Sequence, residues 1–109
     1  MEKISLDQIP VTGLPLYEMR QLFRASGNFS DVKISYITLL PGNRVPVSGT
    51  GVHQEDEYSF FLEGEVYTES GGFQGICRKG DATLIPRGEA HWCENRTDKP
   101  CRLVCVLTK

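Results

Sequence analysis

The segment "GDATLIPRGEAHWCEN", residues 80–95, decides the fold and holds one of the two histidines of the chain. The run "ATLI" has the composition of a strand, and Pro86 in the following "PRGE" supplies the fixed φ that a turn needs. The chain therefore reverses and starts a second strand before His91. Because side chains alternate along a strand, His91, Cys93 and Asn95 share one face of it. The segment predicts a hairpin that carries a histidine.

Short apolar runs alternate with turn clusters through the rest of the chain from Asp31 onward. The runs "VKISYITLL", "EYSFFL" and "FQGICR" are each followed by a cluster rich in glycine, proline or charge, and the last run is "CRLVCVLT". Short strands at regular spacing are typical of an all-β sandwich or barrel. The fold class is therefore predicted to be all-β.

The first thirty residues are less regular. Within them "LPLYEMRQLF" has apolar residues at nearly helical spacing, and the same stretch also suits an edge strand, so its structure stays open. A chain of 109 residues with no linker is the size of one domain. We expect residues 31–109 to form the barrel and residues 1–30 to be an N-terminal extension that packs on the barrel or on a dimer partner.

Charge and composition exclude several classes of partner. The net charge is −2 and the basic residues are dispersed, whereas nucleic-acid binding needs a basic patch. No apolar run has the length of a membrane span or a signal peptide, so we expect a cytoplasmic protein whose partner is a small molecule, not nucleic acid or a membrane. The cysteines are expected to be reduced thiols, since none forms a C-x-x-C pair: Cys77, Cys93, Cys101 and Cys105.

Two runs, "EYSFFL" and "RLVCVL", are apolar on both faces. Alternation places Tyr58 and Phe60 on the face that points away from any pocket. A strand with no polar face needs a second layer or a second subunit over its outer surface. This pattern predicts a homodimer.

The other histidine, His53, stands four residues before Glu57. On a straight strand this spacing would separate the two by about 13 Å. The polar triplet at residues 54–56 predicts a hairpin loop, which would bring their Cβ atoms to about 5 Å from each other. If the sheet closes on itself, His91 meets this pair. The sequence therefore predicts a metal site with His53, Glu57 and His91 as ligands.

Residues 80–95 resemble the second conserved motif of the cupins, G-x5-P-x-G-x2-H-x3-N, through Gly80, Pro86, Gly88, His91 and Asn95. The first cupin motif, G-x5-H-x-H-x3,4-E-x6-G, is matched in its second half by His53, Glu57 and Gly64. Gly51 stands where that motif has its first histidine, so one of the family's usual four ligands is missing. The resemblance spans roughly residues 32–107 and implies a double-stranded β-helix, a jelly-roll barrel with a pocket at one mouth.

The ligand set that the resemblance implies suits a divalent ion such as iron, manganese, nickel or zinc, with Glu55 or Cys93 as candidates for the vacant position. Two functions remain open. The first is an enzyme that acts on a small polar metabolite by dioxygenase-, isomerase- or decarboxylase-like chemistry. The alternative is a non-catalytic binding or sensor module for a sugar- or carboxylate-like ligand, with a degenerate metal site. A purely structural role would require a collapsed, apolar pocket.

Overall fold

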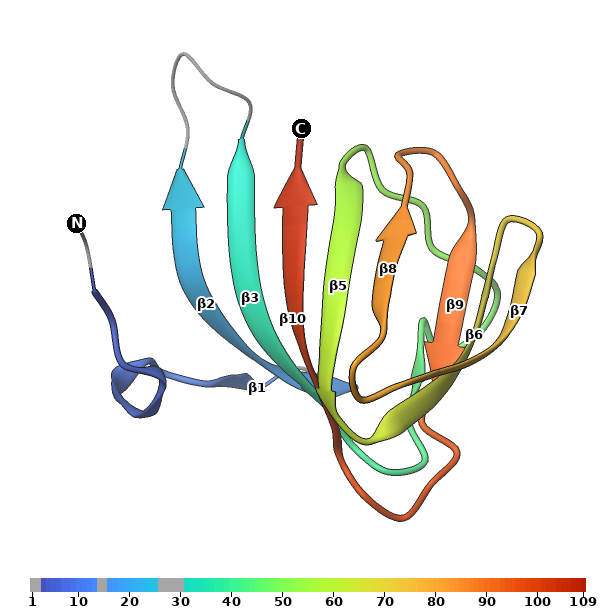
Figure 1. Cartoon of the computed structure of the whole chain (residues 1–109), viewed down its shortest axis with the longest axis horizontal. Helices are drawn as coiled ribbons and strands as arrows, with labels where there is room; N and C mark the ends of the chain where they lie inside the picture. Colours follow the sequence, from blue (N-terminus) through green and yellow to red (C-terminus); the bar gives the residue numbers. More distant parts are fainter. Residues whose placement is uncertain (1–2, 14–15, 26–30) are drawn as a thin grey trace.

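A computed structural model describes residues 3–13, 16–25 and 31–109, and this part of the chain is almost wholly β-structure (Figure 1). The strands are β1 (Thr12–Gly13), β2 (Tyr17–Ala25), β3 (Val32–Leu39), β4 (Arg44–Val45), β5 (Asp56–Glu63), β6 (Glu65–Ser70), β7 (Phe73–Arg78), β8 (Ala82–Ile85), β9 (His91–Glu94) and β10 (Cys101–Thr108). A single 3-10 turn, η1 (Leu6–Gln8), is the one helical element within these ranges. Over the same ranges, no helix has the length and apolarity needed to cross a bilayer.

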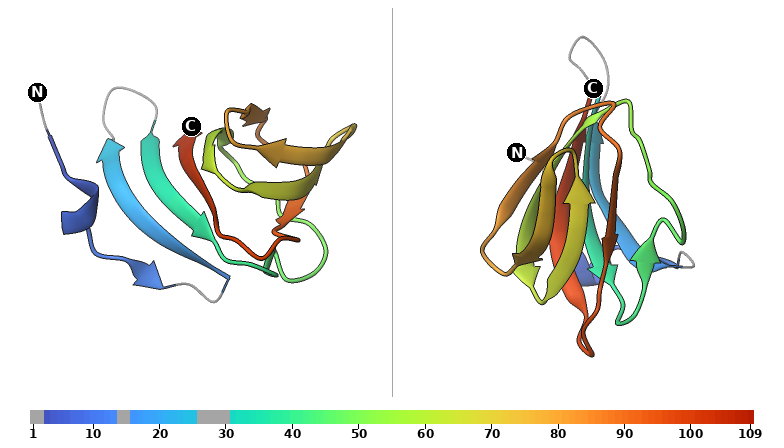
Figure 2. Two further views of the ribbon diagram at one scale, coloured as in Figure 1. Left: turned by 60° about the horizontal axis from the view of Figure 1, so that its bottom comes forward. Right: turned by 90° about the vertical axis from the view of Figure 1, so that its right-hand side faces the viewer.

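The strands form two antiparallel sheets. The six-stranded sheet has the order β1-β2-β3-β10-β5-β8, and the four-stranded sheet has the order β4-β9-β6-β7. The smaller sheet lies at the β5 and β8 end of the larger one (Figure 2). The sheets do not join into one closed ring, and the architecture is a jelly roll. The predicted all-β fold is confirmed.

The core lies between the sheets and receives side chains from both: Leu39, Phe61, Val66, Cys77 and Cys101. On β5 the predicted alternation holds, because Ser59 and Phe61 are buried while Tyr58 and Phe60 are exposed. At the turn into β6, Gly64 has φ +77°, and a Cβ there would overlap the carbonyl of Pro100. The turn therefore needs glycine at this position.

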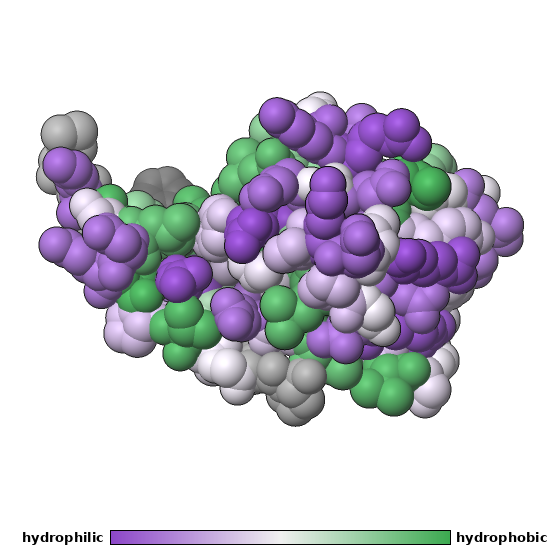
Figure 3. All heavy atoms as spheres, turned by 90° about the horizontal axis from the view of Figure 1, so that it is seen from below, coloured by the Kyte–Doolittle hydropathy of each residue, from purple (hydrophilic) through white to green (hydrophobic). Residues whose placement is uncertain are grey.

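The stretch "LPLYEMRQLF" forms a strand from Tyr17 onward, which settles the choice between helix and strand for these residues. β2 pairs along the whole length of β3, whose free edge would otherwise expose a row of backbone hydrogen-bonding groups. Leu14 and Pro15 lie outside the described residues. Residues 3–11 stand out beside the body of the molecule (Figure 1), and polar and apolar residues are mixed on the face seen from below (Figure 3). Packing of this extension on a dimer partner stays a prediction.

Asn95 fixes the end of β9. It is fully buried, and its side-chain nitrogen donates hydrogen bonds to the carbonyls of Leu39 at 3.0 Å and Lys99 at 2.7 Å. Its side-chain oxygen accepts hydrogen bonds from the amide and the hydroxyl of Thr97. One side chain thus connects β3, β9 and the loop that leads into β10.

We expect Asn95→Ala to lower the free energy of unfolding by about 2 kcal/mol, because alanine leaves buried backbone groups without partners. Urea unfolding followed by circular dichroism measures this loss. Gln74→Ala, which removes an exposed amide from β7, should change stability by less than about 0.5 kcal/mol. Equal stability of the two variants would show that the Asn95 bonds contribute nothing.

Candidate metal centre

A cavity of about 790 Å³ lies between the two sheets. Most of its wall is apolar, with Leu39, Phe61 and Val66 among the buried residues that line it. The wall also contains both histidines of the chain and Glu57. The cavity is therefore apolar with one concentrated polar region, which is the usual character of a small-molecule site.

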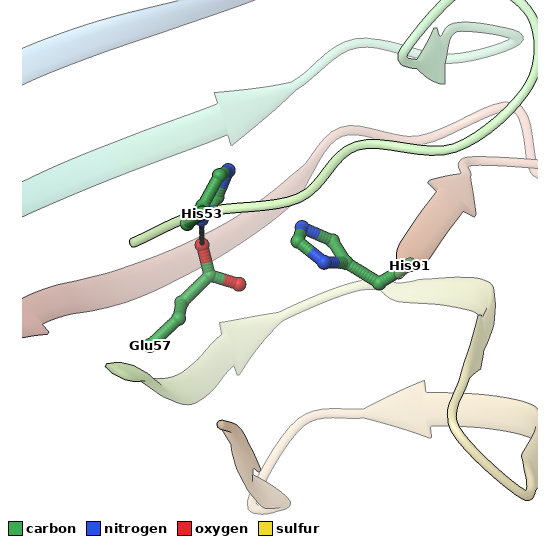
Figure 4. A group of neighbouring side chains, drawn as sticks. All are labelled: His53, Glu57 and His91. Atoms are coloured by element: carbon green, nitrogen blue, oxygen red, sulfur yellow. Dashed lines mark ion pairs between the residues drawn. The ribbon is translucent and has the colours of Figure 1, made fainter. Parts of the chain in front are cut away.

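His53, Glu57 and His91 converge on one point of this wall. Each offers a ligand atom, and these atoms all lie within 4.8 Å of one another. The two imidazole rings have centroids 4.7 Å apart and stand nearly perpendicular, at 81°. In Figure 4 the three side chains point toward one another from the loop before β5, from β5 and from the start of β9. Such a group has the size of a site for one metal ion.

Backbone pairing joins the two segments that carry the histidines. Gly51 and His91 exchange two hydrogen bonds, of 2.8 Å and 3.0 Å, and the amide of Gly88 donates to the carbonyl of His53 at 2.9 Å. The turn before β9 thus lies directly against residues 51–53. Pairing between these two segments, which are far apart in the sequence, places His91 beside His53.

The expected hairpin at residues 54–56 is wrong. The chain bends at Gln54 and Glu55 and then enters β5, in which Glu57 pairs with Leu107 of β10 and Ile85 of β8. Both edges of β5 are occupied, so no returning strand from residue 53 can pair with it. The bend nevertheless brings Nδ1 of His53 to 3.5 Å from Oε1 of Glu57.

The ring of His91 is oriented by the backbone. Its Nδ1 lies 3.0 Å from the carbonyl oxygen of Glu89. A carbonyl only accepts hydrogen bonds, so in the neutral ring Nδ1 carries the proton and Nε2 has the lone pair. A Cβ placed on Gly51 would lie 4.0 Å from this Nε2. The contact with Glu89 thus favours the tautomer of His91 in which Nε2 is available as a metal ligand.

The Nδ1 atom of His53 is buried and has no hydrogen-bond partner within the described residues. Its 3.5 Å contact with Glu57 is an ion-pair distance that lacks hydrogen-bond geometry. A buried polar atom left unsatisfied costs about 1–3 kcal/mol. Two imidazoles and a carboxylate suit a divalent transition metal, and an ion bound among them would satisfy this nitrogen. The residues present therefore fit a metal.

The position opposite His91 belongs to Gly51 and carries no side chain. Of the two other candidates for a fourth ligand, Glu55 lies 3.5 Å from the ammonium group of Lys33. Cys93 lines the cavity, but burial and the nearby Glu57 raise its pKa to about 12. Neither residue belongs to the group of three ligand atoms found among the described residues.

Glu89 is a cavity residue that the sequence interpretation missed. The residue lines the cavity, its carboxylate accepts a 2.6 Å hydrogen bond from the hydroxyl of Ser70, and its carbonyl oxygen contacts Nδ1 of His91. Its position two residues before His91 could have predicted this place, because alternating residues of an extended chain share a face. The cavity lining thus includes Glu89, besides Asp81, as an acidic residue outside the ligand group.

The thiols of Cys93 and Cys105 are expected to be unreactive in the folded protein. Burial first, and then Glu57, raise the pKa of each to about 12, so both stay protonated at pH 8. We expect alkylation by iodoacetamide at pH 8, with chelator present, to be at least about 100-fold slower than in urea-unfolded protein, as measured by peptide mass spectrometry. Equal rates in the two states would contradict this expectation.

The same shifts predict a pH dependence of stability. A thiol whose pKa is raised in the folded state contributes to the free energy of unfolding. This contribution is fully present below the pKa of the thiol in the unfolded state, which is about 8.5. This contribution is lost as the pH rises from there toward about 12. In the metal-free protein the free energy of unfolding, measured by urea unfolding above and below pH 9, should therefore fall with rising pH by less in a Cys93→Ala variant than in the unchanged protein.

Comparisons with known proteins identify the architecture. The family described as a cupin domain matches residues 35–107. A predicted oxalate decarboxylase from Thermotoga maritima is similar in structure, with a TM-score of 0.82 and 22% identity over 98% of each chain. The polyketide cyclase RemF from Streptomyces resistomycificus has a TM-score of 0.81 and 18% identity, covering 99% of this chain and 79% of its own. A cupin 2 conserved barrel domain protein from Salinispora arenicola has a TM-score of 0.78 and 23% identity, covering 100% and 89%. No curated protein sequence matches the chain.

Proposed function

Because this chain belongs to the cupin domain family, we propose that His53, Glu57 and His91 hold a divalent metal ion at which a small molecule binds. The observation that carries the proposal is the buried Nδ1 of His53, which has no hydrogen-bond partner in the described part of the chain and lies beside two other potential ligands. The ion, when bound, would act as a Lewis acid with coordination positions open to the small molecule. Manganese, iron, nickel and zinc all suit such a ligand set.

The residues around the triad of His53, Glu57 and His91 support an enzyme. Glu89 lines the cavity and is not one of the three proposed metal ligands. Proton transfer to or from a bound substrate requires a titratable side chain of this kind. Two proteins with similar structures are described as a predicted oxalate decarboxylase and a polyketide cyclase. We therefore favour a metal-dependent enzyme.

A non-catalytic binding module is the second candidate, and Gly51 favours it. A glycine opposite His91 leaves the metal with three protein ligands, which weakens its retention. A module of this kind would release its metal readily and bind a small molecule without changing it. Turnover of a bound ligand, followed by mass spectrometry, distinguishes the two functions.

Elemental analysis tests the metal site directly. We expect protein purified without chelators to contain about one equivalent of manganese, iron, nickel or zinc per chain and to lose it to EDTA. Stripped protein should rebind one equivalent in equilibrium dialysis. Failure to take up any of the four ions would contradict the proposal.

We also propose that a second copy of the chain covers the outer face of β5. Tyr58, Phe60 and Leu62 are 45%, 47% and 38% exposed there, a row of large apolar side chains on one strand. A row of this kind on a free surface is typical of a protein interface.

A cytoplasmic location of the protein stays a prediction from the sequence.

Phe60→Glu should convert a dimer into a monomer, because it places a charge in the middle of this row. Light scattering coupled to size-exclusion chromatography measures the mass of each species. Val47→Glu adds the same charge at an exposed position outside the row and should leave the mass unchanged. A monomeric unchanged protein, or a dimeric Phe60→Glu variant, would contradict the proposed interface.

A further inference from the structure

Glu89 is a partly buried acidic residue of the cavity wall. None of the ion pairs formed by the described residues includes it, and no lysine or arginine of the described chain lines the cavity. A carboxylate in such a place loses part of its hydration without a cation to compensate for the loss. An ion pair therefore does not explain why the side chain of Glu89 lies there.

The carboxylate of Glu89 is attached to the end of β6. Its Oε2 accepts a 2.6 Å hydrogen bond from the hydroxyl of Ser70, the last residue of that strand. The next residue, Gly71, leaves the space that the carboxylate fills, since a Cβ on Gly71 would lie only 2.6 Å from Oε1 of Glu89. A hydrogen bond to an ionised acceptor is stronger than one between neutral groups. The loop between β8 and β9 is thus joined to β6 through this carboxylate.

Ser70, Glu89 and His91 form a closed circuit of contacts. Ser70 and His91 are directly opposed in the antiparallel pairing of β6 with β9, so their side chains share one face of the sheet. Glu89 contacts both members of this pair, because its carboxylate binds the hydroxyl of Ser70 and its carbonyl oxygen lies 3.0 Å from Nδ1 of His91. The carboxylate and the carbonyl belong to one residue, so a bond that holds the first restricts the movement of the second.

Other contacts hold the loop just before this carbonyl. The amide of Gly88 donates to the carbonyl of His53 at 2.9 Å, and the amide of Glu89 donates to the carbonyl of Pro86 at 3.1 Å. Both bonds fix the turn that follows Pro86, and both end at the amide of Glu89. The bond from Ser70 acts on the same residue from the opposite sheet strand and restrains the direction of its carbonyl.

We propose that Ser70 and Glu89 are positioning residues of the metal site: the Ser70 hydroxyl holds the Glu89 carboxylate, and this bond keeps the Glu89 carbonyl on Nδ1 of His91. A ring held in this way presents the lone pair of Nε2 to the ion. Without the bond the neutral ring takes both tautomers, and in part of the molecules a proton blocks Nε2. The inference rests on the proposed metal site and goes beyond it, since neither positioning residue belongs to the ligand group.

Nitrogen NMR of the metal-free protein with isotope-labelled histidine tests this inference at about pH 8, where free imidazole is neutral. The protonated and the bare nitrogen of a neutral ring differ strongly in chemical shift, and a His53→Ala variant assigns the signals because the chain has 2 histidines. We expect Nδ1 of His91 to carry the proton in at least about nine-tenths of the unchanged protein. The ratio of the two tautomers should fall by about ten-fold in Ser70→Ala and in Glu89→Ala.

Two further variants separate positioning from loss of charge and from loosening of the sheet. Glu89→Gln keeps an oxygen that accepts the hydrogen bond from Ser70, so the tautomer ratio should stay within about three-fold of that of the unchanged protein. Thr68→Val removes a hydroxyl on the same face of β6, which donates to the carbonyl of Trp92 on β9 at 2.9 Å. It should keep the ratio as well. Circular dichroism checks that every variant folds.

Metal affinity is the second readout. In equilibrium dialysis Ser70→Ala should bind zinc about ten-fold more weakly than the unchanged protein, because groups that orient a ligand contribute this much to affinity. Thr68→Val should bind zinc within about three-fold of the unchanged protein.

The outcomes separate this inference from the proposed function. An unchanged tautomer ratio in Ser70→Ala overturns the positioning, and so does an equal fall in Thr68→Val. A fall in Glu89→Gln as large as in Glu89→Ala overturns it too, since the charge would then matter and not the hydrogen bond. A shifted ratio with unchanged zinc affinity overturns the role in metal binding. An unchanged protein that takes up no ion overturns the metal site, while the tautomer ratios still report whether Ser70 and Glu89 orient the ring.

Discussion

We expect His91→Ala to lower the affinity of the protein for a divalent ion by at least about 100-fold, because it removes one of the three proposed metal ligands. Loss of groups that merely orient a ligand costs about 10–100-fold, so loss of the ligand itself should cost more. The fold is kept, since residues 51 and 91 pair through their backbone atoms, which alanine retains. Equilibrium dialysis with manganese or zinc measures the change.

Cys93→Ala is the matched control for this loss. Cys93 follows His91 by two residues on β9 and lines the same cavity, yet it lies outside the ligand group. Its replacement should change metal affinity by less than about three-fold. If the His91→Ala variant binds metal as tightly as the control does, the triad is not the metal site.

Gly51→His should raise the affinity for a divalent ion by about 100-fold, which corresponds to about 2.7 kcal/mol. Gly51 and His91 form a directly opposed pair, so a side chain on residue 51 lies on the same face as the ring of His91. The nearest atoms to a Cβ at this position are 3.9–4.0 Å away, and the backbone is not left-handed. The new imidazole therefore starts beside the ligand atoms without strain.

Thr50→His is the control for a histidine added near the site. Thr50 precedes Gly51, is exposed and does not line the cavity, so alternation directs its side chain away. Competition with a fluorescent zinc chelator compares the two variants with the unchanged protein. If Gly51→His and Thr50→His raise the metal affinity equally, the gain comes from binding at the surface, and residue 51 is not the position of a fourth ligand.

The sequence alone determined the features that depend on local chemistry. Pro86 and the residues after it specify a turn whatever surrounds them, and alternation along a strand assigns each neighbouring side chain to one face or the other. For this reason the two strands on either side of Pro86 and the outward direction of Tyr58 and Phe60 were predicted correctly. The predicted hairpin is wrong, because β8 pairs with β5 in one sheet and β9 pairs with β4 and β6 in the other. The spacing of the motif residues also matched the family that the comparisons confirm.

Only the tertiary structure decided which segments become neighbours. β2 is a strand because β3 offers it a full edge, and His53 reaches Glu57 through a bend because β8 and β10 occupy both edges of β5. Residues that are distant in the sequence become neighbours through such strand pairings. A local sequence pattern does not specify which strand pairs with which sheet edge. The apolar cavity wall and the position of Glu89 beside His91 follow from the same packing of two sheets.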